Sequence, residues 1–214
     1  YEVYTREGSV LPTRAIIIAT GKAPNRLAVP GEQEFVGRGV SYCATCDAAF
    51  FKDADVAVVG PGESAADAAL ELAALGARVT LISLQALKVP EAMMDHITSM
   101  PNITLKTGWK VTEIVGDSRV TGVRIKNPKE GTEELVPVSG VFIESGSIAV
   151  SEFTAGLVEM NAKGEIVIDN RGATSAPLIY AAGDVTDTPG KQIIIAAGEG
   201  ARAAMALSRD LKRQ

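Results

Sequence analysis

The residues best suited to chemistry are Cys43 and Cys46, which are the only cysteines in the chain. Two thiols at this Cys-x-x-Cys spacing can form and break a disulfide within one small ring. A nearby cation or helix N-terminus can lower the pKa of one of them. A carboxylate, Asp47, follows directly. The same spacing is also used in zinc sites, but here the chain offers no further cysteine and only one histidine, His96.

A second motif follows closely. The apolar run over residues 56–59, which follows Asp55, leads into a Gly-x-Gly-x-x-Ala turn, and a helix-forming stretch comes after it. This pattern is typical of the strand, phosphate turn and helix of a dinucleotide-binding unit, although it also occurs in turns that bind no ligand. Together with the cysteine pair, it indicates a redox dithiol beside a bound nucleotide. The candidate nucleotide contacts are Gly60, Gly62, Glu63, Ser64 and Ala65.

Composition limits the classes of function. The 214 residues are 46% hydrophobic and 22% charged, which suits one large globular domain or two modest ones. A net charge of -5 argues against nucleic-acid binding, which favours basic surfaces. The apolar runs are far shorter than the roughly 20 residues of a membrane span. Closely spaced cysteines with none elsewhere suit a catalytic dithiol in a reducing compartment, so we expect a cytoplasmic location.

The hydrophobic periodicity predicts an α/β fold. Residues 22–39 are rich in proline and glycine and are expected to form a connector without regular structure. Residues 103–142 alternate between apolar and polar around turn signals, which predicts an antiparallel meander. Residues 15–19 are apolar throughout, which predicts a strand covered on both faces. Trp109 is interpreted as a packing residue, and His96 as a surface or packing residue. Strands are expected over 1–6, 10–18, 55–60, 78–83, 165–169 and 178–182, and helices over 63–75, 90–98 and 192–211.

Several motifs recur in a known order from one end of the chain to the other. They are Ala19-Thr20-Gly21, Pro30-Gly31-Glu32, Phe35-x-Gly37-Arg38-Gly39-Val40-Ser41, Cys43-Ala44-Thr45-Cys46-Asp47, Gly60 to Ala65, Gly164-Glu165-Ile166, Ala182-Gly183-Asp184 and Lys191 to Gly200. On these motifs the sequence resembles the low-molecular-weight thioredoxin reductase family and the related flavoprotein component of alkyl hydroperoxide reductase. Because the chain begins at Tyr1 within a strand pattern, we expect it to be a segment of a longer protein.

The resemblance implies a domain organisation and a reaction. Residues 25–142 would form a Rossmann-like, three-layer pyridine-nucleotide domain with an antiparallel meander. It would be inserted into a partial FAD-binding domain of the same type, made of residues 1–24 and 143–214. Electrons would pass from NADPH or NADH through FAD to Cys43 and Cys46, and then to thioredoxin or a similar protein disulfide. Members of the family are typically homodimers.

The resemblance also implies roles for single residues. Cys46 would exchange electrons with the flavin, and Cys43 would attack the partner disulfide. Asp47 would handle the thiol proton, a role that can coexist with capping a helix N-terminus. Asp184 would hydrogen-bond the ribitol of FAD. The other implied flavin contacts are Thr20, Gly21 and Gly183, with Lys191, Gln192 and Ile193 at the flavin ring.

Three departures from the family pattern keep alternatives open. The N-terminal Gly-x-Gly-x-x-Gly unit that binds the ADP half of FAD is absent from the sequence. After the second strand, neutral Ser83 replaces the acid of NADH-binding members, and Lys88 is the one cation where NADPH-binding members carry several. Glu144 and Ser145 are polar where the family is usually apolar, and the expected proline after them is Ala149.

These departures define the competing hypotheses. The retained glycine turn favours a nicotinamide nucleotide as the electron donor. The first alternative is a relative that does not use one, such as a ferredoxin-dependent thioredoxin reductase or a dithiol oxidase. The second is a fragment that binds partners without catalysis.

Overall fold

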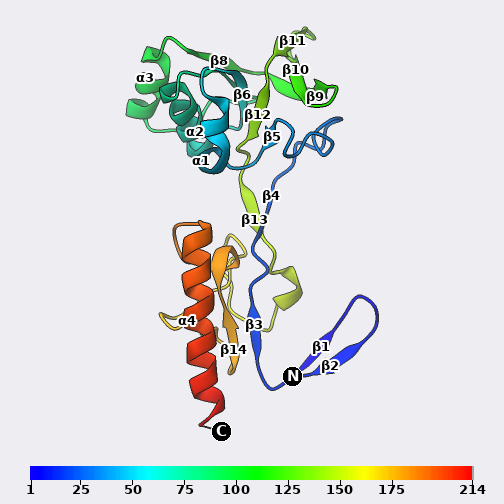
Figure 1. Cartoon of the computed structure of the whole chain (residues 1–214), viewed down its shortest axis with the longest axis vertical. Helices are drawn as coiled ribbons and strands as arrows, with labels where there is room; N and C mark the ends of the chain where they lie inside the picture. Colours follow the sequence, from blue (N-terminus) through cyan, green and yellow to red (C-terminus); the bar gives the residue numbers. More distant parts are fainter. Residues whose placement is uncertain (214) are drawn as a thin grey trace. The chain divides into compact units, whose positions relative to one another are not determined.

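The computed structural model describes residues 1–213, which fold as two compact units (Figure 1). The inserted unit comprises residues 24–146. The split unit is built from both ends of the chain, residues 1–23 and the chain from Ser147 onward. The sequence placed the same two divisions after residues 24 and 142, and the structure places them after residues 23 and 146.

The inserted unit is organised around a five-stranded parallel sheet of order β5-β12-β6-β7-β8. Its strands are β5 (Val40–Ser41), β12 (Gly140–Ile143), β6 (Asp55–Val59), β7 (Arg78–Ser83) and β8 (Ile103–Thr107). A second, antiparallel sheet has the order β11-β10-β9, from Glu133–Pro137, Val120–Lys126 and Lys110–Gly116. The helices are α1 (Ala44–Asp47), the 3-10 helix η1 (Ala48–Phe51), α2 (Glu63–Ala74) and α3 (Glu91–Ser99).

Side-chain alternation along the central strand divides the inserted unit into three layers (Figure 1). Val56 and Val58 of β6 pack with the helices, whereas Ala57 and Val59 pack against the antiparallel sheet. All four are buried, which explains why the strand is apolar after Asp55. The buried face of α2 is largely alanine, so that helix can lie close to the sheet.

The predicted antiparallel meander over residues 103–142 is wrong at both ends. Its first strand, β8, pairs in parallel with β7, and its last, β12, pairs in parallel with β5 and β6. Within residues 103–142, only β9, β10 and β11 form antiparallel pairs. Alternation reports how a strand's faces are buried but not which strand it pairs with, so the local pattern could not separate these cases. The predicted connector also contains a short strand, β4 (Lys22–Pro24).

The split unit has a smaller parallel pair, β3 (Ile16–Ile18) with β14 (Ile179–Ala181). Tyr180 of β14 packs toward α4 (Ile193–Leu211), and Ile179 packs into a cluster on the opposite face. The remaining elements are the hairpin β1 (Glu2–Tyr4) and β2 (Val10–Pro12), strand β13 (Ser147–Ala149) paired with β4, and the 3-10 helices η2 (Glu152–Thr154) and η3 (Gly183–Val185).

Three sequence predictions for the split unit need correction. The run over residues 10–18 is two strands, because the hydroxyl of Thr13 bonds the carbonyl of Ala15 and turns the chain between them. Residues 165–169 form only isolated bridges, with Ile166 donating to the carbonyl of Val185. The strand over residues 15–19 is not covered on both faces: Ile17 is 40% exposed among the residues described.

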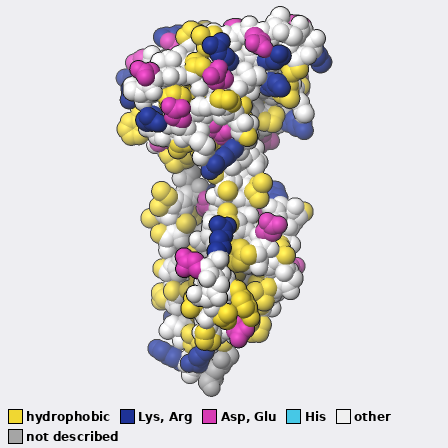
Figure 2. Space-filling model, turned by 90° about the vertical axis from the view of Figure 1, so that its right-hand side faces the viewer, with side chains coloured by type: hydrophobic (Ala, Val, Ile, Leu, Met, Phe, Trp, Pro, Cys, Tyr) yellow, Lys and Arg dark blue, Asp and Glu magenta, His cyan; other side chains and the backbone are white. Residues whose placement is uncertain are grey.

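The surface carries charge of both signs. On the face drawn in Figure 2, Lys and Arg side chains are interspersed with Asp and Glu over the inserted unit. Within residues 1–213, no helix combines the length and the apolar character needed to cross a lipid bilayer.

Candidate disulfide redox site

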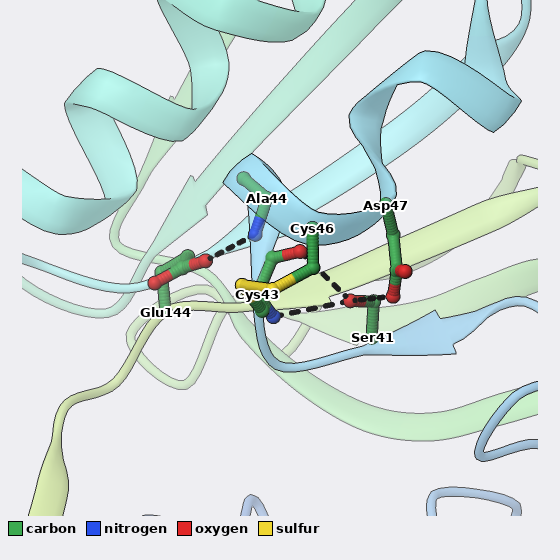
Figure 3. Close-up of a disulfide and its surroundings, with 6 residues drawn as sticks. All are labelled: Ser41, Cys43, Ala44, Cys46, Asp47 and Glu144. Carbon is green, nitrogen blue, oxygen red and sulfur yellow. Dashed lines mark hydrogen bonds between the residues drawn. A yellow bond between two sulfur atoms is a disulfide. The ribbon is translucent and has the colours of Figure 1, made fainter. Parts of the chain in front are cut away.

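Cys43 and Cys46 are joined by a disulfide at the carboxyl edge of the parallel sheet (Figure 3). Strand β5 ends at Ser41, and the extended Cys43 is the N-cap of α1. The backbone N–H groups of Cys46 and Asp47 both donate to the carbonyl of Cys43, which closes the turn. Cys43 is half-buried and Cys46 is exposed, so the disulfide is within reach of a partner molecule.

Ser41 holds Asp47 beside the disulfide. Its buried hydroxyl donates to Oδ2 of Asp47 at 2.7 Å and accepts from the backbone N–H of Cys43 at 3.1 Å. Asp47 occupies the N-cap position of η1, but its side chain makes no capping hydrogen bond. The side chain of Asp47 therefore does not cap the N-terminus of η1, although the sequence allowed a capping role for it. Asp47 is thus a half-buried carboxyl that is fixed by a hydroxyl and directly follows Cys46 in the chain, and a carboxyl can exchange a proton with a thiol within its reach.

Glu144 provides a second carboxyl. Its Oε1 accepts a hydrogen bond from the backbone N–H of Ala44, at 3.2 Å, and in the view of Figure 3 the disulfide lies between Glu144 and Asp47. Burial raises the pKa of Glu144, the Ala44 N–H lowers it, and the charge of Glu71 raises it further.

A buried carboxylate braces the chain before the cysteines. Glu32 is 1% exposed and accepts hydrogen bonds from the backbone N–H groups of Leu27 and Ala28, at 3.1 and 2.7 Å. The hydroxyl of Tyr42 donates to it at 2.8 Å. Burial and this hydrogen bond raise the pKa of Tyr42 to about 12. The Pro30-Gly31-Glu32 motif therefore fixes the residue that directly precedes Cys43.

The glycine turn lies at the same edge of the sheet, where β6 leads into α2. A Cβ on Gly60 would lie 2.2 Å from the carbonyl oxygen of Glu144, so this position is glycine because of the chain's own backbone. A Cβ on Gly62 would meet no atom within 4 Å, so this glycine faces open space. Glu63 and Ser64 are exposed in the first turn of α2, and Ala65 is buried beneath them. The side open to a ligand is therefore that of Gly62.

A cavity of about 350 Å³ opens next to this turn, lined largely by apolar side chains such as Trp109. Ser83, at the end of β7, also lines it. Its hydroxyl is the single buried side-chain polar atom within residues 1–213 that lacks a hydrogen-bond partner. Buried hydroxyls are nearly always paired, so this one fits a ligand that brings its own hydroxyl, such as a ribose. The backbone of Lys88 also runs beside the turn, donating to the carbonyl of Pro61.

The residues assigned to the flavin lie in the split unit, and the structure brings only some of them together. Gly21, Gly183, Asp184 and Ile193 line one cavity of about 210 Å³. The carboxylate of Asp184 makes no hydrogen bond within the described residues, which leaves it free for a ligand hydroxyl.

The other three assigned residues do not line this cavity. The hydroxyl of Thr20 donates to the carbonyl of Val150, and Nζ of Lys191 donates to the carbonyl of Thr186. Gln192 is the exposed N-cap of α4. Four of the seven assigned residues therefore suit one bound group.

Residues 2–201 match the family model described as pyridine nucleotide-disulphide oxidoreductase. The chain belongs to this family. It is 41% identical over 205 residues to the alkyl hydroperoxide reductase F protein of Staphylococcus aureus (strain MRSA252), covering 95% of this chain and 40% of that protein. Thioredoxin reductase from Streptococcus pyogenes MGAS5005 superposes with a TM-score of 0.89 at 35% identity, over 96% of this chain and 68% of that one. The enzyme from Giardia duodenalis has a TM-score of 0.85 at 31% identity, over 97% and 69%.

These matches confirm the predicted α/β fold and the resemblance to thioredoxin reductases and to the hydroperoxide reductase flavoprotein. The family to which the chain belongs is one of oxidoreductases. The chain spans 40% of the length of the curated relatives that it matches.

Sequence reasoning missed three residues of this pyridine nucleotide-disulphide oxidoreductase that the structure places at the two loops. Ser41 was available from its spacing to Cys43 and Asp47. Glu144 and Ser83 had been noted for their polarity but not assigned a contact. Ser83 is the last residue of β7, and Glu144 directly follows β12. The carboxyl ends of parallel strands lie at one edge of the sheet, so the two residues belong to the same edge.

Proposed function

We propose that the chain carries the dithiol centre of a flavin-dependent disulfide reductase of thioredoxin-reductase type. The observation that carries the proposal is the surface disulfide of Cys43 and Cys46, with Asp47 held beside it by Ser41. In this proposal the inserted unit is the pyridine-nucleotide domain, and the split unit is part of the FAD-binding domain.

The dithiol reaction follows from this arrangement. The thiolate of Cys43 attacks one sulfur of a partner disulfide, forming a mixed disulfide and releasing one partner thiolate. Asp47 takes the proton of the attacking thiol and returns it to the departing sulfur. Cys46 then attacks the sulfur of Cys43, which restores the internal disulfide and releases the second partner thiol. Two electrons and two protons leave the chain, and the partner disulfide is reduced to a dithiol.

A hollow next to Asp47 supports a protein as the partner. This docking cavity has a volume of about 410 Å³ and is lined by Arg38, Phe50 and Arg119, among others. Phe50 is 83% exposed, which is unusual for a large apolar side chain. An exposed aromatic flanked by arginines is the composition favoured at protein interfaces. A thioredoxin-like protein disulfide is therefore the proposed substrate.

The cofactors proposed are FAD and a reduced pyridine nucleotide, NADPH or NADH. Bound FAD supplies an electron pair to the Cys43–Cys46 disulfide. Of the residues proposed to hold it, Gly21, Gly183, Asp184 and Ile193 line one cavity, whereas Thr20, Lys191 and Gln192 lie outside that cavity. The glycine turn, from Gly60 to Ala65, is proposed to hold the nucleotide pyrophosphate, with Ser83 at the ribose.

Two further properties complete the proposal. The cysteine usage supports a reducing compartment, the cytoplasm. The likeness to thioredoxin reductases supports a homodimer, which sedimentation of the purified chain would test.

A single-turnover experiment tests the dithiol reaction without requiring FAD. The purified chain is reduced with dithiothreitol, freed of it, and mixed with an oxidised thioredoxin whose new thiols are counted. We expect about two new thioredoxin thiols per wild-type chain and none with Cys43→Ser, whereas Cys46→Ser should stop at the mixed disulfide and release about one thiol per chain. Phe50→Ala should slow the transfer while leaving its final extent unchanged. Absence of transfer from the wild-type dithiol would favour a binding module without turnover.

A second experiment identifies the donor. Calorimetric titration of the chain with NADPH and, separately, with NADH should give binding in the micromolar range for one of them. If neither binds, the proposed nucleotide donor is wrong, and a ferredoxin-dependent or oxygen-linked relative becomes the better hypothesis.

A further inference from the structure

The end of β12 holds Glu144 between the two loops of the site. Because β12 lies between β5 and β6, the residue after it sits between the cysteine turn and the glycine turn. The backbone N–H of Glu144 donates to the carbonyl of Val59 at 2.8 Å, and the hydroxyl of Ser64 bonds its carbonyl at 3.4 Å. The absence of a side chain at Gly60 leaves room for that carbonyl. The backbone of Glu144 is therefore fixed from several sides.

The side chain of Glu144 is directed at the cysteine turn. Its Oε1 accepts from the backbone N–H of Ala44, which directly follows Cys43 and lies within the disulfide ring (Figure 3). The ionisable groups near this carboxyl are the cysteines once reduced, in the cysteine turn, and Glu71 on α2. None of these groups is a cation. A negative charge on Glu144 is therefore repelled by Glu71 and by any thiolate that forms in the cysteine turn.

We propose that Glu144 is a second carboxyl of the dithiol centre, whose negative charge opposes formation of the neighbouring cysteine thiolate and so sets the pH range in which the dithiol is nucleophilic. This inference rests on the proposed redox role of the pair. Glu144 acts through the thiols and transfers no electrons, so it is a positioning residue.

The physical reason is the coupling between two acids that become negative. A like charge nearby disfavours ionisation, so the thiol ionises at higher pH while Glu144 is charged. When the dithiol ionises without a partner disulfide present, the proton released by the thiol passes to the solvent. Burial and Glu71 already favour the neutral form of Glu144, as its raised pKa records. In the oxidised chain the cysteines carry no charge, so reduction adds the competing ionisation.

The experiment measures the reactivity of the thiols as a function of pH. The chain of 214 residues is reduced with dithiothreitol and alkylated with iodoacetamide from about pH 5 to about pH 10, with each cysteine quantified by mass spectrometry. For Glu144→Gln, which keeps an oxygen acceptor for Ala44 but loses the charge, the midpoint of the more reactive cysteine should fall by roughly one pH unit. Glu144→Asp, which keeps the charge, should stay close to wild type. Glu91→Gln, an equal charge change at an exposed position on α3, should have no effect.

The outcomes separate this inference from the proposed function. An unchanged midpoint in Glu144→Gln, or an equal shift in Glu91→Gln, would overturn the role of Glu144 alone. Cysteines that dithiothreitol fails to reduce would instead contradict the proposed function. If Glu144→Gln does not fold, the carboxyl carbon shift of Glu144 is followed by NMR in the wild-type chain. Its titration must differ between the oxidised and reduced forms, and identical titrations would reject the coupling.

Discussion

Around Cys43 and Cys46 the polar groups are paired within the chain itself. Ser41 bonds Asp47, Ala44 bonds Glu144, and the hydroxyl of Tyr42 bonds a buried carboxylate. At the glycine turn, on the same edge of the same sheet, the pairing is incomplete. Ser83 has a buried hydroxyl without a partner in the described chain, and Gly62 faces open space.

The difference indicates how each region works. The cysteine loop is held in one arrangement before any partner arrives, so a docking disulfide meets groups that need little reordering. Beside the glycine turn, the hydroxyl of Ser83 is buried without a hydrogen bond, which costs free energy. A ligand that bonds this hydroxyl would remove that cost. Four substitutions test this difference between the two regions, and Glu32→Ala is expected to have the largest effect.

Replacing Glu32 by Ala should have the largest effect. It removes the acceptor of Leu27, Ala28 and Tyr42 at a site that is 1% exposed. Two backbone N–H groups and the hydroxyl of Tyr42 lose a charged acceptor, so the free energy of unfolding should fall by about 3 kcal/mol. Urea unfolding followed by the fluorescence of the single tryptophan measures the inserted unit. The exposed Glu34→Ala should change little, and an equal loss in both variants would mean that the cysteine loop is not braced by Glu32.

Replacing Asp47 by Asn should lower the rate of disulfide transfer to thioredoxin by roughly 100-fold, since a positioned acid or base contributes at least that much. The fold should be unchanged, because an amide can still accept from the hydroxyl of Ser41. Stopped-flow kinetics of the reduced chain measures the rate. Ser41→Ala should give a smaller loss, because it frees Asp47 without removing it. A normal rate in Asp47→Asn would mean that solvent supplies the proton.

Local sequence patterns predicted the elements that position both loops. The strand over residues 78–83 coincides with β7, and the helix over residues 63–75 agrees with α2 (Glu63–Ala74) except at its last residue. The motif spacing also placed the cysteines ahead of a strand, turn and helix, because each of these features lies within a short stretch of chain.

The contacts at the site depend on strand order, which local patterns do not contain. Glu144 reaches the cysteine turn only because β12 inserts between β5 and β6. The alternation in residues 103–142 placed that strand in an antiparallel meander instead. The sequence also could not show that the hydroxyl of Ser83 lacks a hydrogen-bond partner, because this depends on the positions of all its neighbours in the folded chain.

Tyr42 should make the stability of the cysteine loop depend on pH. Its pKa of about 12 in the folded chain lies above the ordinary value of 10, so the folded state favours the neutral phenol. The resulting stabilisation is complete below about pH 10 and is lost as the pH rises toward about 12. The difference in unfolding free energy between wild type and Tyr42→Phe should therefore shrink from about pH 9 upward. A constant difference for Tyr42→Phe over this pH range would remove the link to Glu32.

Ser83→Ala should have the smallest effects, and they should have opposite signs. Without ligand, the variant loses an unpaired buried hydroxyl, so its free energy of unfolding should rise by about 0.5 to 1 kcal/mol. With ligand, it loses a hydrogen bond, so the affinity for whichever of NADH and NADPH binds should fall about 3- to 10-fold. Chemical denaturation and calorimetric titration measure the two quantities, with the exposed Ser99→Ala as the control for both. If Ser83→Ala lowered the stability of the free chain, the hydroxyl would already have a partner such as water, and the glycine turn would be as fully paired as the cysteine loop.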